Sequence, residues 1–290
     1  MTDGQMKVII NKILAQDGVP WRRTFSKIGR PRNYNSKRFY HGINLLLFHA
    51  MDYPSPDFIT FKKAMDENIK LEKGKSIFAV AWIPKYKKKD NESPAMFEDR
   101  KKHGKPNYFG LLFHNLWNIS NTSKWDEIKD EKVEAQTIIN PQTIINLTPL
   151  QFTLIESGKA KCIPNKKIPI IGMPPKAHFD SLEEYYETFF HEMTHATKNH
   201  LNRKYKDEAD IKEGYAAEEL VAEICAWLLC QESGISNDTM INNSASYIAG
   251  WKARIKNNPD VLFWAMIEAE KSLNYIMGRK NVRSNYEKSV

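Results

Sequence analysis

Residues 191–195 read His-Glu-Met-Thr-His, and this pentapeptide decides how the chain is interpreted. Residues four apart on an α-helix differ by about 40° in direction, so His191 and His195 face one point in space. Two imidazoles placed in this way suit a tetrahedral zinc site, and Glu192 lies where a carboxylate can activate water. The motif therefore predicts Zn2+ as cofactor, His191 and His195 as ligands, and Glu192 as the catalytic base.

The sequence before the motif predicts that it lies on a helix. Ser181-Leu-Glu-Glu184 has the pattern of a capping box, in which a serine and a later glutamate satisfy the first free N–H groups. An apolar face with helical spacing follows, made by Leu182, Tyr185, Tyr186, Phe189, Phe190, Met193 and Ala196. We expect a helix of about residues 182–203.

A second periodic segment, residues 215–233, predicts another helix that supplies the third ligand. A catalytic zinc site has three protein ligands and leaves the fourth position to water. We expect Glu219 to be the third ligand, and Glu223, one turn later, to accept a hydrogen bond from a ligating histidine and orient it. Glu218 is the alternative ligand, and a solvated face of glutamates is the alternative to any metal role. The pair Glu219 and Glu223 after such a motif resembles the gluzincin metallopeptidases.

The composition argues against a membrane protein. Apolar residues make up 41% of the 290 residues, which is enough for one large or two medium cores. The mean hydropathy is −0.57, and no apolar run approaches the roughly 20 residues of a spanning helix. The first residues lack the apolar core of a signal peptide, and the three cysteines fit no zinc-ribbon spacing. We expect a cytoplasmic protein with no membrane partner.

The charge is divided unevenly along the chain. Residues 1–125 contain 23 Lys and Arg against 11 Asp and Glu, a net charge of +12, whereas residues 126–290 contain 20 against 24, a net charge of −4. This uneven distribution predicts that the first half binds a polyanion. A charge that served only solubility would not need to be concentrated in one half of the chain. An acidic stretch at 126–134 predicts a linker or a short helix, and we place a linker at residues 126–140, between a domain of residues 1–125 and one of residues 141–290.

Residues 21–41 are the main candidate for contact with nucleic acid. They contain seven Lys and Arg and no acid, with aromatic residues between them. Cations that follow phosphates and rings that stack on unpaired bases are typical of single-strand binding. The alternative, in which the rings are core and the arginines a solvated face, fits this segment equally well. Together with two lysines of a predicted turn, the DNA-binding candidates are Trp21, Arg22, Arg23, Arg30, Arg32, Arg38, Tyr40, Lys73 and Lys75.

The remaining pattern places further elements around these motifs. It predicts short strands at 76–82, 108–119 and 168–171, and helices at 241–257 and 260–278. A basic run at residues 85–89, followed by polar residues, predicts a hairpin tip or loop that adds phosphate contacts without reading sequence. The second half is therefore expected to be mostly helical.

Several stretches carry a resemblance to the ArdC/TraC antirestriction family of conjugative plasmids and phages. They are Gly18-Val-Pro-Trp21 through Tyr40-His-Gly-Ile-Asn44, Phe113-His-Asn-Leu-Trp-Asn-Ile-Ser120, Met173 through His195, and residues 215–223 and 245–251. The resemblance implies an amino-terminal single-stranded-DNA-binding domain, a zincin-like metallopeptidase domain, and protection of incoming DNA from host restriction. It also implies His191, His195 and Glu219 as ligands and Glu192 as base.

Two departures from the family pattern bear on the expected cleft. Ala196 stands where many relatives have Trp, and Lys166-Lys167 replaces an acidic residue before the Ile-x-x-Pro segment. Neither change removes a ligand. Both are expected to alter the cleft and its substrate preference.

We expect an α+β protein: a small basic domain that binds single-stranded DNA, followed by a mainly helical zincin-like domain of the gluzincin type. The predicted function is a sequence-nonspecific antirestriction protein of a mobile element, with a zinc metallopeptidase-type site and an unidentified protein substrate. It would act in the cytoplasm, including that of a recipient cell if it is transferred with DNA. One alternative is a DNA-shielding protein with a structural or vestigial zinc site, which an intact Glu192 disfavours. The other is a zinc protease whose basic half binds an acidic protein partner.

Overall fold

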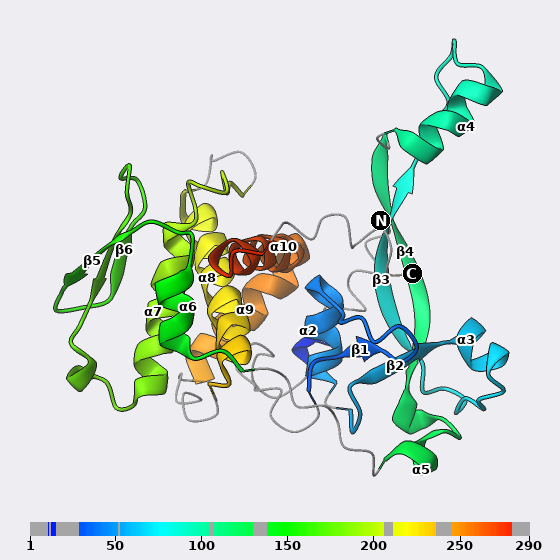
Figure 1. Ribbon diagram of the computed structural model, residues 1–290, viewed down its shortest axis with the longest axis horizontal. Helices are drawn as coiled ribbons and strands as arrows, with labels where there is room; N and C mark the ends of the chain where they lie inside the picture. Colours follow the sequence, from blue (N-terminus) through cyan, green and yellow to red (C-terminus); the bar gives the residue numbers. More distant parts are fainter. Residues whose placement is uncertain are drawn as a thin grey trace.

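The computed structural model describes residues 11, 13–15, 29–51, 53–104, 107–129, 138–205, 211–235 and 245–279. Two separate sheets flank a group of helices, with the larger sheet built from the first half of the chain and the smaller one from the second (Figure 1). The predicted α+β class is therefore confirmed. None of the described helices is long and apolar enough to cross a membrane.

The larger sheet is built around a long antiparallel pair. Its strands follow the order β1-β2-β4-β3, with β1 parallel to β2 and the other pairs antiparallel. The bounds are β1 Arg32–Asn33, β2 Asp57–Thr60, β3 Ile77–Lys85 and β4 Tyr108–Asn118, so the strands predicted at 76–82 and 108–119 are confirmed. Ala79 lies opposite His114 in the β3–β4 pair, which places both side chains on one face of the sheet.

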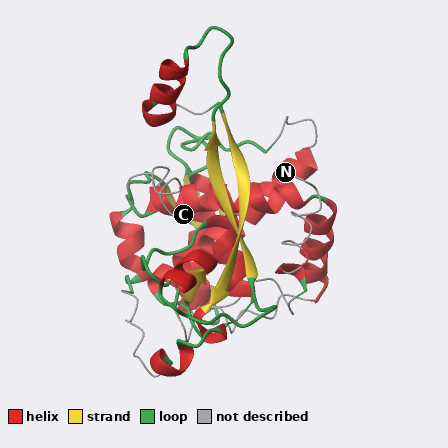
Figure 2. Ribbon diagram, turned by 90° about the vertical axis from the view of Figure 1, so that its right-hand side faces the viewer, coloured by secondary structure: helices red, strands yellow, loops and turns green. Residues whose placement is uncertain are grey.

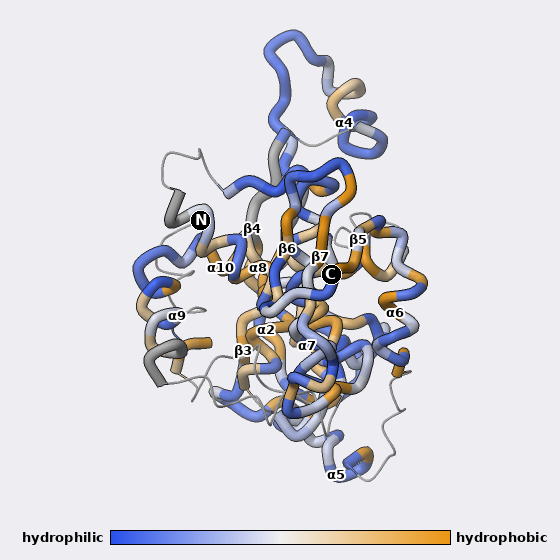
Figure 3. The backbone as a smooth tube through the Cα atoms, turned by 90° about the vertical axis from the view of Figure 1, so that its left-hand side faces the viewer, coloured by the Kyte–Doolittle hydropathy of each residue, from blue (hydrophilic) through white to orange (hydrophobic). Residues whose placement is uncertain are grey.

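Strands β3 and β4 continue beyond the sheet as a twisted two-stranded arm with α4 at its tip (Figures 1 and 2). Helix α4, Pro94–His103, begins after Ser93, whose hydroxyl accepts a hydrogen bond from the Met96 N–H. Much of the tip is hydrophilic (Figure 3). The basic tip predicted from residues 85–89 thus carries a helix rather than a plain turn.

Helix α2, Gly42–Ala50, is covered on more than one side. Its residues Leu45, Leu46, Leu47 and Phe48 are all buried, because β3 lies against one part of the helix and α10 against another. The shorter helices of this half are α3 Phe61–Asp66, η2 Ile119–Asn121 and α5 Trp125–Ile128.

The second half is mainly helical, as predicted. Its helices are α6 Pro141–Leu147, η3 Lys176–His178, α7 Leu182–Ala196, α8 Ile211–Ser233, α9 Ala245–Asn257 and α10 Pro259–Ile276. The smaller sheet has the order β5-β7-β6, with bounds β5 Thr153–Glu156, β6 Lys161–Ile163 and β7 Ile170–Met173. Strand β7 includes the end of the segment predicted at 168–171, and it packs with β6 against α7.

Helix α7 begins as predicted but ends early. The Ser181 hydroxyl accepts a hydrogen bond from the Glu184 N–H at 3.1 Å, which satisfies a free donor of the first turn. The helix ends at Ala196 rather than near residue 203. Asn202 has a positive φ of 49°, and the Arg203 N–H bonds back to the Lys198 carbonyl. The chain turns here because the Arg203 side chain enters the interior, where it is buried.

The two halves of the chain share one hydrophobic core. A single cluster of buried residues includes Leu46 and Phe58 from the first half and Trp227 and Leu262 from the second. Helix α10 packs on both α8 and α2, and the apolar segments gather there (Figure 3). Residues 130–137 of the predicted linker lie outside the described residues, so the division at residues 126–140 stays a prediction.

Candidate metal centre

The motif helix and the following helix bring three metal-ligand side chains together. His191 and His195 come from α7 and Glu219 from α8, and one donor atom of each lies within 4.8 Å of the others. His195 Nε2 is 3.1 Å from His191 Nε2 and 3.5 Å from a Glu219 oxygen, while His191 Nε2 is 3.4 Å from the other oxygen. These donors converge because α7 and α8 pack side by side and the two histidines lie one turn apart.

Glu218 holds the far side of the His195 ring. Its Oε1 is 3.3 Å from His195 Nδ1, so an Nδ1–H that donates to this carboxylate leaves the Nε2 lone pair directed at the group of donors. Burial alone would raise the pKa of Glu218, but the hydrogen bonds from His195 and Arg203 outweigh burial and lower it. The side chain is therefore a carboxylate, as an acceptor in this position must be.

Arg203 fixes Glu218 from behind. Its Nε donates to one carboxylate oxygen at 3.1 Å and its Nη2 to the other at 2.5 Å, the two-point geometry that suits a guanidinium. The remaining donors reach the Thr197 and Ser272 hydroxyls at 2.5 and 2.8 Å and the Thr194 carbonyl at 2.8 Å. One fully buried arginine thus ties α7, α8 and α10 around the histidine.

Glu192 lies beside the three donors and is 8% exposed. Burial raises the pKa of this carboxyl, although the nearby charges of His191 and His195 act in the opposite direction. Burial alone would lower the pKa of His191, but the hydrogen bond to Glu219 and the charges of Glu223, Glu192 and Glu219 outweigh burial and raise it. Glu192 is therefore within electrostatic reach of the donors.

The donor set fits a divalent ion. Two imidazole nitrogens and a carboxylate oxygen from different turns match the ligands that zinc takes in catalytic sites. The half-buried donors leave the group accessible on one side, as a site with an open position requires. His195 also has the outer hydrogen-bond partner that metal-bound histidines usually have.

Comparisons with known proteins match both halves of the chain. Residues 4–112 match the family described as the N-terminal domain of anti-restriction factor ArdC, and residues 146–268 match that described as zincin-like metallopeptidase. The chain is an ArdC-like protein. The resemblance predicted from the sequence is confirmed.

Solved structures show the same fold. The ArdC-like chain superposes on the antirestriction ArdC protein from plasmid R388 with a TM-score of 0.69 for the metal-free structure, at 23% identity, covering 95% of this chain and 99% of that one. For the Mn(II)-bound structure the TM-score is 0.67 at 22% identity, covering 94% and 97%.

Two curated relatives, both named DNA primase TraC from Escherichia coli, are much longer. One is 26% identical over 280 residues, which cover 89% of this chain and 25% of the relative. The other is 24% identical over 302 residues, which cover 93% and 20%. The ArdC-like chain thus spans about a quarter or less of the length of these relatives.

The predicted site residues of the second half meet in space. His191, Glu192, His195 and Glu219 form one group, and Glu223 lies one turn after Glu219 on α8, where its charge acts on His191. Glu218, the alternative ligand, instead contacts the outer nitrogen of His195. Glu218 thus makes the outer contact to His195, and the role of Glu223 in orienting a ligating histidine stays a prediction.

The predicted DNA-binding residues are scattered. Trp21, Arg22 and Arg23 lie outside the described residues, whereas Arg38, Lys73 and Lys75 are exposed. Arg30 and Arg32 lie in ion pairs. Arg30 Nη1 is 3.6 Å from Glu232 with 10% of its side chain exposed, and Arg32 donates to Asp57 at 3.0 Å. Tyr40 is half-buried and lines a pocket. The first-half candidates therefore differ in how accessible they are.

Sequence reasoning missed two features of the ArdC-like chain. Arg203 was not singled out, because nothing in the sequence distinguishes it from Lys198 and Lys204, which also follow the motif helix. His114 belongs to a stretch that carried the family resemblance, but nothing in its neighbours marked it as a pocket residue.

Proposed function

We propose that this chain is an antirestriction protein that binds single-stranded DNA through its first half and carries a zinc peptidase-type site in its second. The grouping of His191, His195 and Glu219 around one point, with Glu192 beside them, carries the proposal. The relatives named antirestriction protein support the antirestriction role. The activity would be exercised in the cytoplasm that receives the DNA.

The peptidase half of the proposal assigns a role to each residue. His191, His195 and Glu219 would hold the metal, and a bound zinc ion would supply Lewis acidity toward a carbonyl and lower the pKa of water. Glu192 would take a proton from the attacking water and pass it to the leaving amine. Glu218 and Arg203 would keep the His195 ring in place.

The DNA-binding half rests on charge and its exposure. The first half has a net charge of +12, and lysines are exposed at the 73–75 turn and along the arm at Lys85 and Lys87–Lys89. The arm formed by β3 and β4 extends from the body of the molecule, so its lysines can contact several phosphates along a DNA strand (Figures 1 and 2). Such contacts to phosphates bind without sequence preference.

The alternatives make different demands on Glu192. A strand-coating protein with a structural or vestigial zinc site needs no base, whereas hydrolysis of a protein substrate needs Glu192. A protease whose basic half binds an acidic protein would not bind strands at all. The protease with an acidic protein partner therefore differs from our proposal in its affinity for single-stranded DNA. The strand-coating protein differs in that replacing Glu192 would have no effect on its activity.

The test compares Glu192→Gln with Glu183→Gln, an exposed change on the same helix. Zinc content and single-strand affinity of the purified full chain should match wild type in both variants.

Plasmid transfer into a restricting host then measures protection. We expect Glu192→Gln to protect at least partly, and joint replacement of Trp21, Arg22 and Arg23 to abolish protection. Loss of protection in Glu192→Gln with intact strand binding would make hydrolysis, not shielding, the mechanism. Failure of the wild type to bind strands would overturn the DNA-binding proposal.

A further inference from the structure

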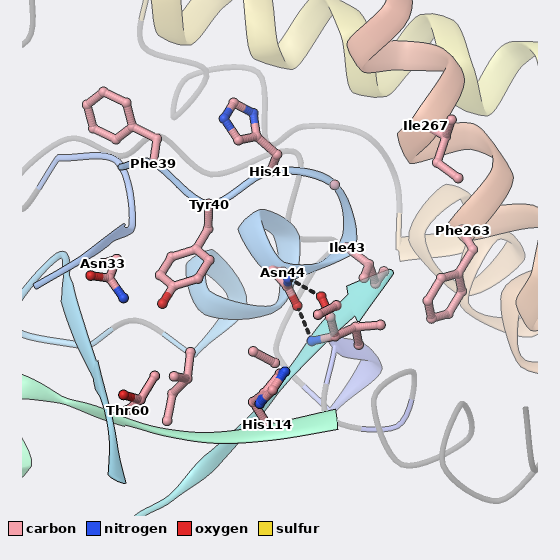
Figure 4. A pocket seen from close by; sticks show the side chains of 15 residues that line it. Asn33, Phe39, Tyr40, His41, Ile43, Asn44, Thr60, His114, Phe263 and Ile267 are labelled. Carbon is pink, nitrogen blue, oxygen red and sulfur yellow. Dashed lines mark hydrogen bonds between the residues drawn. The ribbon is translucent and has the colours of Figure 1, made fainter. Parts of the chain in front are cut away.

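A pocket of about 130 Å³ opens between the two halves of the molecule (Figure 4). The segment between β1 and α2 forms one wall with Phe39, Tyr40 and His41, and α10 forms another with Phe263 and Ile267. His114 of β4 rises from the sheet into the same space. Ala79 opposite His114 has a side chain too small to fill the space above the strands.

One polar atom in this pocket lacks a partner among the described residues. His114 Nε2 is buried and makes no hydrogen bond, although buried polar groups are nearly always hydrogen-bonded. The Asn44 amide is already engaged, because it donates to the Val80 carbonyl and accepts from the Val80 N–H at 2.7 Å each (Figure 4). The Asn33 side chain lies near the Tyr40 hydroxyl, whose pKa burial raises to about 12. His114 is thus positioned to meet a group that enters the pocket.

The walls select the kind of group that fits. Rings make up much of the lining, and Phe39, 44% exposed, offers a ring face to solvent. The pocket, at about 130 Å³, is smaller than the roughly 300 Å³ at which sites for drug-sized ligands begin, so it suits one flat ring system, single or fused. An anion is disfavoured, because Arg30, whose guanidinium lies over the Phe39 ring at 5.4 Å, is engaged with His41 and Glu232. An uncharged heteroaromatic ring with a hydrogen-bonding edge meets these conditions.

We propose that this pocket takes one unstacked nucleobase of a bound single strand, with a base edge on His114 Nε2 and the Phe39 ring at the mouth. The inference rests on the proposed strand binding and gives it a structural reason, since only an unpaired base can leave the stack and enter. Lys37 and Arg38 precede Phe39 in sequence and are exposed, so they are the nearest cations for the flanking phosphates, although Lys37 Nζ also lies 3.3 Å from Asp57. The pocket accepts any base, because ring stacking and one hydrogen bond do not distinguish sequences strongly.

The test uses the full chain and two strands of equal length and charge, oligo-dT and the same backbone with abasic sites. Phe39→Ala and His114→Phe are compared with Phe61→Ala, which removes a similarly exposed ring outside the pocket. Wild type should prefer oligo-dT. Phe39→Ala should weaken oligo-dT binding by about fivefold or more, the effect of losing a stacked base, and leave abasic-strand binding unchanged.

His114→Phe keeps a ring in the pocket but removes the nitrogen, so it should reduce the preference for oligo-dT less than Phe39→Ala does. Far-ultraviolet circular dichroism checks that each variant is folded. If the pocket variants keep the wild-type ratio of oligo-dT to abasic affinity, the pocket inference fails although strand binding stands. If wild type binds neither strand, the proposed function fails as well.

Discussion

The metal centre and the pocket are built in different ways. The metal centre takes its donors from two regular helices, and a buried arginine fixes the ring of one histidine. The pocket is assembled from the segment between β1 and α2, the first turn of α2, all four strands of the larger sheet, and α10 from the second half of the chain. A site on packed helices is set by residue spacing, whereas the pocket exists only once the two halves have met.

The largest effect is expected at the metal centre. His195→Ala removes a ligand and should reduce zinc from near one per chain to near zero. His200→Ala, just beyond the motif helix and exposed, should keep the metal. Elemental analysis of protein purified without chelator measures both. Full zinc in His195→Ala would show that the metal is held elsewhere, while strand affinity should be unchanged in both variants.

The next effect concerns the arginine behind the metal centre. Arg203→Met leaves the Glu218 carboxylate buried without its partner, and breaking a buried pair in this way costs about 3–5 kcal/mol of unfolding free energy. Lys204→Met, next in sequence and exposed, should change it by less than about 0.5 kcal/mol. Chemical denaturation of the metal-free protein gives both values. Equal stabilities would mean that the pair does not hold this part of the core.

A smaller effect is expected from the carboxylate itself. Glu218→Gln keeps the shape of the side chain but weakens its hold on His195, so zinc affinity should fall about 10- to 100-fold. Glu183→Gln serves as the matched control. Competition with a chelator of known affinity measures the change. Loss of all metal would instead assign Glu218 as a ligand, the alternative considered from the sequence.

The smallest effect is expected in the first half. Replacing Lys73 and Lys75 with alanine removes two exposed cations, so the slope of log affinity against log salt should become shallower by about 1.4 if each contacts a phosphate. Zinc content should not change. Arg32→Ala should mainly lower stability, because this side chain is paired with Asp57. An unchanged slope in the lysine variant would place the strand on another face.

The grouping of the three candidate ligands could be predicted from the sequence because helical periodicity fixes where side chains point, whereas their binding of a metal stays a prediction. His191 and His195 needed only the spacing rule, and Glu219 needed only a second helix packed close to the first. The end of α7 was predicted wrongly, since Thr197–Arg203 contains no glycine or proline and the turn is made by Asn202 in a left-handed conformation. That conformation is stabilised by the tertiary bonds of Arg203, which no local pattern reveals.

The first half was less predictable for a related reason. Its cations look alike in the sequence but differ in the structure. Arg30 contacts Glu232 and His41, and Arg32 is paired with Asp57. Lys73 and Lys75, in contrast, are exposed. The pairing partners are far away along the chain, so composition gives the net charge but not its accessibility. His114 was missed because its importance comes from the unpaired nitrogen and the space beside it.

The first turn of α2 has a consequence for the order in which the protein folds. The side chain of its N-cap residue, His41, does not cap the helix, and the Gly42 N–H donates instead to the Glu270 carboxylate of α10 at 2.6 Å. The cap therefore emerges from the ribosome 228 residues after the helix it completes. Until then α2 has an unsatisfied first turn and an uncovered apolar side. We therefore expect the first half to complete its packing only after α10 has been made, and a pause in synthesis before α10 to leave this half exposed to aggregation.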